Sequence, residues 1–204
     1  MKSKVLENKR MKQEALTNSA FNLLIQKDIH EITISDIAKD AGVAKGTFYL
    51  YFKDKYHICD YVVQKESEKL FLKAHEALVA SDIENFEDRM VFWINQVIMQ
   101  LEENPVILRF VQKNFTWGLF RVKDQQYEII EEYNITKEFE IEARKKGFRY
   151  DNPAITLYTL IELVASTCYG CILFSQPMSM DDYRPYLFEA IYAILRAAKR
   201  EIKE

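Results

Sequence analysis

Residues 33–55 read TISDIAKDAGVAKGTFYLYFKDK, and this stretch decides the fold. Thr33 stands where a helix needs an N-cap oxygen, and Asp36 three residues later completes a capping box with Asp in place of the commoner Glu. Gly42 follows the apolar positions at the point where the chain must reverse, because glycine tolerates the positive φ of a residue that ends a helix. The pattern predicts two short helices joined by a tight turn.

The second of these helices has an unusual outer face. If Phe48 points inward, a rotation of about 100° per residue places Phe52 almost above it and turns Gly46 and Leu50 to the opposite side. An outward leucine on a short helix is unusual unless a partner covers it, and a thymine methyl group or a sugar-phosphate strand would do so. The stretch therefore indicates a DNA-binding helix-turn-helix rather than a hairpin with solvated lysines and core aromatics.

About the first quarter of the chain resembles the N-terminal module of the tetracycline-repressor (TetR) family of bacterial transcriptional regulators. The residues that carry the resemblance are Thr33, Ile37-Ala38, Ala41-Gly42-Val43, Gly46-Thr47-Phe48-Tyr49, Tyr51-Phe52 and Lys55. The resemblance implies DNA contacts from Thr33, Ser35, Lys45, Gly46, Thr47, Tyr49, Leu50, Tyr51 and Lys55.

The chemistry of these side chains suggests different roles on DNA. Thr47, Tyr49 and Lys55 suit phosphate oxygens better than base edges. Lys45 is the best candidate for a base contact, because lysine can donate to guanine O6 or N7 in the major groove. The recognition helix carries no Arg, Asn or Gln, so we expect sequence preference to come partly from methyl contacts and DNA shape.

The charge is unevenly distributed along the 204 residues, whose net charge is −3. Residues 1–55 carry 10 Lys or Arg against 7 Asp or Glu, net +3, and the remainder carries 18 against 24, net −6. Within the positive part, Lys2, Lys4, Lys9, Arg10 and Lys12 are candidates for the minor groove or the phosphates, although a basic terminus is as often only solvated.

Composition favours a cytoplasmic regulator over an enzyme or a secreted protein. Three cysteines indicate a reducing compartment, and Cys168 and Cys171 lie in an apolar helical run where buried thiols are the default. The N-terminus has no continuous apolar segment of the secretory kind. We found no metal-ligand spacing, no glycine-rich phosphate loop, no Glu-x-x-His pair and no nucleophile motif, so we expect no metal, no cofactor and no catalytic site.

The whole chain is expected to be all-α, since five glycines and four prolines leave little room for sheet. We predict a nine-helix, two-domain regulator with a helix-turn-helix domain over 1–53 and a larger effector-binding and dimerisation domain over 54–204. The expected helices lie near 8–27, 34–41, 45–51, 54–80, 84–103, 105–116, 125–146, 153–175 and 182–202.

The last two helices are the candidates for dimerisation. Between Ala154 and Phe174 apolar and small residues cover most of the circumference, and a helix apolar all round must be buried on several sides. Glu162 would be costly in hydrocarbon, so a core or dimer helix fits better than a membrane span. By resemblance to the family, helices near 153–175 and 182–202 pair with their symmetry mates, which implies a homodimer and a palindromic operator.

Aromatic side chains are dense in the middle of the chain and predict an effector cavity. Such residues, taken singly, are as often plain core. Glu162 needs either an internal partner, such as Arg109, Arg121 or a tyrosine hydroxyl, or a cationic ligand. The candidate ligand-binding residues are Trp93, Phe110, Trp117, Tyr127, Glu162 and Tyr169.

The sequence therefore predicts a homodimeric repressor released from double-stranded operator DNA by a lipophilic or aromatic small molecule. Repression enters by resemblance, and a transcriptional activator of the same fold is the first alternative. An all-α ligand-binding protein, an enzyme without DNA binding and an architectural helical dimer without a ligand are the others.

Overall fold

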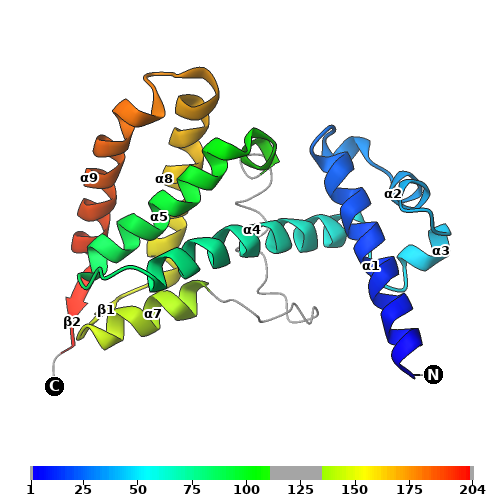
Figure 1. Ribbon diagram of the computed structural model, residues 1–204, viewed down its shortest axis with the longest axis horizontal. Coiled ribbons are helices and arrows are strands. Elements are labelled where there is room, and N and C mark those ends of the chain that lie inside the picture. Colours follow the sequence, from blue (N-terminus) through cyan, green and yellow to red (C-terminus); the bar gives the residue numbers. More distant parts are fainter. Residues whose placement is uncertain (1, 111–134, 203–204) are drawn as a thin grey trace. The chain divides into compact units, whose positions relative to one another are not determined.

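The computed structural model describes residues 2–110 and 135–202, and it confirms an almost entirely helical chain (Figure 1). The described residues form two compact units, the first ending at Ser67 and the second starting at Glu68. The long helix α4 (Lys55–Val79) contributes residues to both units. Each unit has its own buried apolar side chains, so each is described by itself.

The first unit contains α1 (Lys2–Leu24), the 3-10 helix η1 (Ile29–Glu31), α2 (Ile34–Asp40), α3 (Lys45–Phe48) and the first part of α4. Its core is made by apolar residues from every one of these segments except η1. They are Leu16, Ala20, Leu24, Ile37, Ala38, Phe48, Ile58, Val62 and Val63.

The turn between α2 and α3 forms as the sequence predicts. The Asp36 backbone N–H donates to Thr33 Oγ1 at 3.1 Å, and the Thr33 backbone N–H donates to Asp36 Oδ2 at 2.9 Å. Gly42 has a φ of 68°, and the Val43 N–H reaches back to the carbonyl of Ala38 at 2.9 Å. This is the Schellman arrangement that ends a helix on a left-handed glycine.

The second unit contains α5 (Phe86–Glu103), a helical segment over residues 105–110, α7 (Ile135–Lys145), α8 (Pro153–Phe174) and α9 (Met180–Ala198). In α8 the buried residues recur at helical spacing along one face, as do those of α9. They are Thr156, Leu157, Leu160, Val164, Cys168 and Cys171 in α8, and Met180, Leu187, Ile191 and Leu195 in α9.

A small antiparallel sheet, which the sequence did not predict, pairs β1 (Phe148–Tyr150) with β2 (Lys199–Glu201). The helix expected over 182–202 therefore ends at Ala198. Contacts distant in sequence explain the change: Lys199 Nζ lies 3.0 Å from the carboxylate of buried Glu87 and 3.9 Å from the centroid of the Phe148 ring. A partly buried ion pair and a cation–π contact outweigh a weak local helix preference.

The start of the chain also differs from the prediction. Helix α1 begins at Lys2 rather than near residue 8 and ends at Leu24 rather than residue 27. The 3-10 helix η1 was missed, although Asp28 and Glu31 form a capping box around it.

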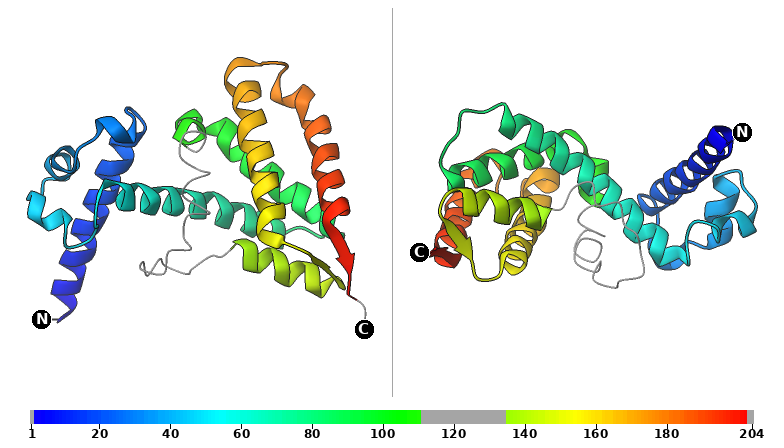
Figure 2. Two further views of the ribbon diagram at one scale, coloured as in Figure 1. Left: turned by 180° about the vertical axis from the view of Figure 1, so that it is seen from behind. Right: turned by 90° about the horizontal axis from the view of Figure 1, so that it is seen from below.

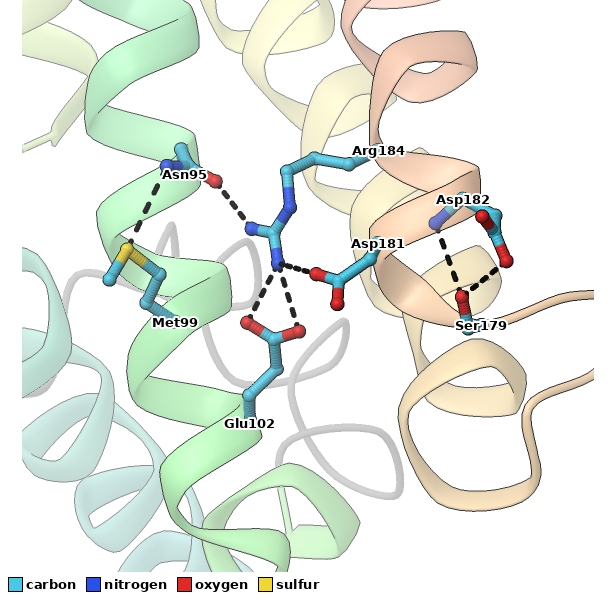
Figure 3. A network of polar contacts seen from close by, with 7 residues as sticks. All are labelled: Asn95, Met99, Glu102, Ser179, Asp181, Asp182 and Arg184. Carbon is cyan, nitrogen blue, oxygen red and sulfur yellow. Dashed lines mark hydrogen bonds and ion pairs between the residues drawn. The ribbon is translucent and has the colours of Figure 1, made fainter.

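Arg184 ties α9 to α5 (Figure 3). Its guanidinium donates to both carboxylate oxygens of Glu102 at 3.0 Å and to the side-chain oxygen of Asn95 at 2.6 Å. One nitrogen, Nη2, serves both carboxylate oxygens and the other, Nη1, serves Asn95, so the guanidinium is held by two residues of α5. The network therefore sets where α9 begins relative to the end of α5.

Gly170 allows the chain to fold back after α8. The Gln176 N–H donates to the Gly170 carbonyl at 3.2 Å, and a Cβ placed on Gly170 would lie 2.8 Å from the Gln176 carbonyl oxygen. This glycine therefore serves a turn within the chain.

A pair of glycine substitutions tests this constraint. Gly170→Ala and Gly46→Ala gain the same helix propensity, about 1 kcal/mol. Only the first places a methyl group against a backbone oxygen, because nothing lies within 4 Å of a Cβ on Gly46. We expect urea denaturation to place Gly170→Ala about 1–3 kcal/mol below Gly46→Ala in unfolding free energy. Equal stabilities would contradict the close approach.

Candidate DNA interface

The surface of α3 and of the turn after it combines apolar and hydrogen-bonding groups. Leu50 is 75% exposed and Tyr49 is 54% exposed, although both follow the fully buried Phe48. Lys45 and Gly46 are also exposed, while Thr47 and Tyr51 are partly buried and partly open. The structure thus brings most of the sequence-predicted contact residues onto one short segment.

At the start of α2, Thr33 and Ser35 are exposed, but the Thr33 side chain is already occupied. Its hydroxyl accepts from the Asp36 backbone and donates to the Asp36 carboxylate at 2.7 Å. These bonds from Thr33 lower the pKa of the Asp36 carboxyl below its ordinary value. The Thr33 backbone N–H is occupied by the same carboxylate, so a phosphate contact from Thr33 requires its hydroxyl to rotate away from Asp36.

Lys55 has a structural role that the sequence did not reveal. Its ammonium donates to the carbonyls of His30 at 3.2 Å and Ile32 at 3.0 Å, and it lies 5.6 Å from the centroid of the Tyr56 ring. An ammonium has three N–H donors, so one remains for a phosphate. Lys55 as a phosphate ligand stays a prediction, and in this structure it ties α4 to the segment before α2.

The start of α4 adds two residues that sequence reasoning missed. Tyr56 is 43% exposed, which no helical pattern revealed. His57 Nδ1 accepts a hydrogen bond from the Lys53 backbone N–H at 3.1 Å, while Asp54 caps the helix by accepting from the backbones of Tyr56 and His57 at 2.9 Å. These bonds fix the connection between the recognition segment and α4.

Comparison with known proteins identifies this module. The family described as bacterial regulatory proteins, tetR family, matches residues 16–62, which span α1 to the first part of α4. The helix-turn-helix module of this chain is therefore similar to that of TetR-family regulators. An HTH-type transcriptional regulator of Staphylococcus aureus strain USA300 is 25% identical over 199 residues, covering 92% of this chain and 94% of that protein. A second one, from strain MRSA252, is 27% identical over 103 residues, which is 50% of this chain and 54% of the relative.

Solved structures share the fold of this chain over nearly its whole length. The fatty acid degradation regulator FadR of Bacillus halodurans has a TM-score of 0.60 at 18% identity, covering 89% of this chain and 94% of its own. FadR of Bacillus subtilis, solved in complex with stearoyl-CoA, has a TM-score of 0.61 at 18% identity, covering 88% and 97%. At this identity the likeness establishes the fold.

The predicted effector residues have different environments in the second unit. Trp93 and Phe110 are buried, and no hydrogen bond from the described part of the chain reaches Trp93 Nε1, although the atom is inaccessible to solvent. Tyr169 is partly exposed and makes an edge contact with Phe174. Trp117 and Tyr127 lie outside the described residues.

Glu162 is less buried than the sequence predicts. The prediction placed its carboxylate on a helix buried on all sides, but Glu162 is only half-buried and already takes part in an interaction within the chain. A half-exposed carboxylate keeps much of its hydration, so it does not require a cationic ligand.

The cysteines Cys59, Cys168 and Cys171 are buried core residues. Burial raises the pKa of Cys59 and of Cys168 to about 12, and it also raises the pKa of Cys171. Thiols with such pKa values stay protonated and unreactive near neutral pH. Among residues 2–110 and 135–202, no group of three His, Cys, Asp or Glu side chains could hold a metal ion.

The surroundings of His57 make the stability of the folded protein depend on pH. Burial, as the main cause, lowers the pKa of His57 in the folded protein, so the unfolded chain takes up the proton more readily. This contribution to stability is present above about pH 6.5, the ordinary value, and is lost as the pH falls through the lowered folded pKa. We expect His57→Asn, which keeps an acceptor for the Lys53 N–H, to lose less unfolding free energy than wild type when the pH falls below 6.5.

Urea denaturation at several pH values measures this difference. His30→Asn, which removes an exposed imidazole, is the matched control and is expected to behave like wild type. A wild-type pH dependence in His57→Asn would contradict the assignment.

Proposed function

We propose that this protein is a homodimeric transcriptional regulator that binds a palindromic operator through α3 and is released by an apolar small molecule. The observation that carries the proposal is the display of Leu50 and Tyr49 in solvent beside Lys45 and Thr47. A large apolar side chain at 75% exposure in the turn after a four-residue helix gains nothing from water, but it can pack against a thymine methyl group. The relatives named as HTH-type transcriptional regulators support the same function.

The exposed side of α8 and α9 supports dimerisation. Of the most apolar 18 residues of α8, only 28% are buried within the chain, and α8 is the one described helix long and apolar enough to cross a membrane. Ile155 is 57% exposed, Phe174 60% and Tyr186 on α9 67%. An apolar surface of this kind on a TetR-family chain is best covered by the same helices of a second copy. Such a twofold dimer places two recognition helices on successive turns of the duplex.

Two features of Trp93 in the second unit suggest the chemical class of the effector. Trp93 packs on Phe71 with ring centroids 5.1 Å apart, and its indole N–H is buried without a hydrogen-bond partner among the described residues. A lipophilic molecule with one acceptor atom would satisfy both features. The ligand in the Bacillus subtilis FadR structure, stearoyl-CoA, contains a long lipophilic acyl chain. A hundredfold loss of operator affinity needs about 2.7 kcal/mol of coupling, which is ordinary for allostery.

Repression is proposed as the mode of control, with activation as the second candidate. Selecting bound duplexes from random DNA gives the operator, and its position relative to the promoter distinguishes the two modes. A selected site with twofold symmetry is expected, and failure to enrich any sequence would contradict the proposed function.

Two substitutions on the exposed segment test the DNA contact. Tyr49→Ala and Leu50→Ala remove large exposed side chains, so we expect stability within about 0.5 kcal/mol of wild type. We expect operator affinity to fall at least tenfold, measured by fluorescence anisotropy on the selected duplex. Leu72→Ala, which truncates a 40% exposed side chain in the second unit, is the control and should bind like wild type.

A charge on α8 tests the dimer. We expect Ile155→Glu to leave the helical content unchanged, because the residue is exposed within the chain, and to shift the protein to monomer in analytical ultracentrifugation. Val79→Glu, which changes a 66% exposed residue at the end of α4, is the control and should stay dimeric. A dimeric Ile155→Glu would place the interface elsewhere.

A further inference from the structure

The start of α1 forms an arm whose described side chains are not covered by the first unit. Residues 6–12 are all exposed, and from residue 6 onward Leu16 is the first large apolar residue to be fully buried. Figures 1 and 2 show this end of α1 extending away from α2 and α3. The family match starts only at residue 16, so the arm, defined as residues 2–12, lies outside the shared module.

The composition of the arm is strongly basic. It carries five basic residues and one acidic residue, Glu7. The arm's basic residues are Lys2, Lys4, Lys9, Arg10 and Lys12. A short helical extension without packing is marginal in water, and closely spaced like charges weaken it further. A polyanion bound along the arm would relieve both penalties.

The charges of the arm are available for such a partner. Among the described residues, no hydrogen bond or ion pair engages the ammonium groups of Lys9 and Lys12, which are both exposed. Arg10 forms an exposed pair with Glu14 at 3.1 Å, a contact that is weak and screened by salt. The ammonium groups of Lys9 and Lys12 are therefore not neutralised within α1.

A membrane surface fits the arm less well than a duplex. Leu6 is 66% exposed and Met11 is 61% exposed, but helical geometry places them about 140° apart around the axis. A helix that lies on lipid gathers its apolar residues on one side. Here apolar and basic residues alternate around the helix. This pattern suits a partner that binds mainly through its negative charge.

We propose that residues 2–12 bind the phosphate backbone of duplex DNA beside the segment contacted by α3. The proposal rests on the proposed function and extends it with a second contact on each protomer. Eleven helical residues reach about 16 Å, which is enough to follow several successive phosphates. These contacts add affinity and salt dependence without sequence preference.

The experiment compares two variants with the same change in charge. Lys9→Gln with Lys12→Gln removes two charges of the arm, and Lys69→Gln with Lys73→Gln removes two exposed charges of α4 in the second unit. The probe is a fluorescein-labelled random 30-bp duplex, and anisotropy is measured between about 50 and 200 mM KCl. Circular dichroism and thermal unfolding confirm that both variants fold.

The outcomes separate the two proposals. Each lost phosphate contact reduces the slope of log affinity against log salt by about 0.9, so a dimer lacking four contacts should lose about 3–4 units of slope. The α4 variant should keep the wild-type slope. If both variants keep it, the arm proposal is wrong while DNA binding stands; if wild type does not bind the duplex, the proposed function fails as well.

A vesicle assay covers the competing partner. We expect the arm variant and wild type to bind phosphatidylcholine–phosphatidylserine vesicles equally weakly. Loss of vesicle binding in the arm variant, with an unchanged salt slope on DNA, would make the arm a lipid contact and overturn the proposal.

Discussion

The burial of Phe48 is the interaction on which the rest of the DNA-binding unit depends. Helix α3 has only four residues, and one turn of helix does not repay its own nucleation cost in water. Phe48 is fully buried and its ring lies 5.7 Å from that of Phe52, which is 2% exposed. The Ser19 hydroxyl, which donates to the Ile37 carbonyl at 2.9 Å, holds α1 against α2. Tertiary packing therefore gives the recognition segment its direction.

This arrangement separates stability from recognition. The buried side chains of the segment stabilise it by removing apolar surface from water. The exposed side chains can therefore be ones that do not favour folding. Gly46 costs helix stability of about 1 kcal/mol, and Leu50 exposes apolar surface. Positions where local preference and the fold disagree are expected at functional sites. The same reasoning applies to the exposed side of α8, where Ile155 and Phe174 add nothing to the stability of a single chain.

Features that depend on neighbours in sequence could be predicted, and those that depend on distant partners could not. The Thr33–Asp36 capping box and the left-handed Gly42 involve residues within about five positions of one another, so residue types and spacing were sufficient. The end of α9 depends on a contact between Lys199 and Glu87, which are 112 positions apart. The internal role of Lys55 depends on carbonyls 23 and 25 residues earlier, which carry no sequence signal. Side-chain type suggested a phosphate ligand but could not reveal this competing partner.

The second unit joins the two surfaces on which regulation would depend. Helix α5 carries buried Trp93 and also Asn95 and Glu102, which hold Arg184 on α9. A ligand that moves α5 must therefore move α9 with it or break the Arg184–Glu102 ion pair, whose partners are 20% and 29% exposed. Breaking a partly buried charge pair is costlier than shifting two helices together, because each charge loses a partner without regaining full hydration. The network thus favours a response in which the proposed effector site and the proposed dimer surface move together.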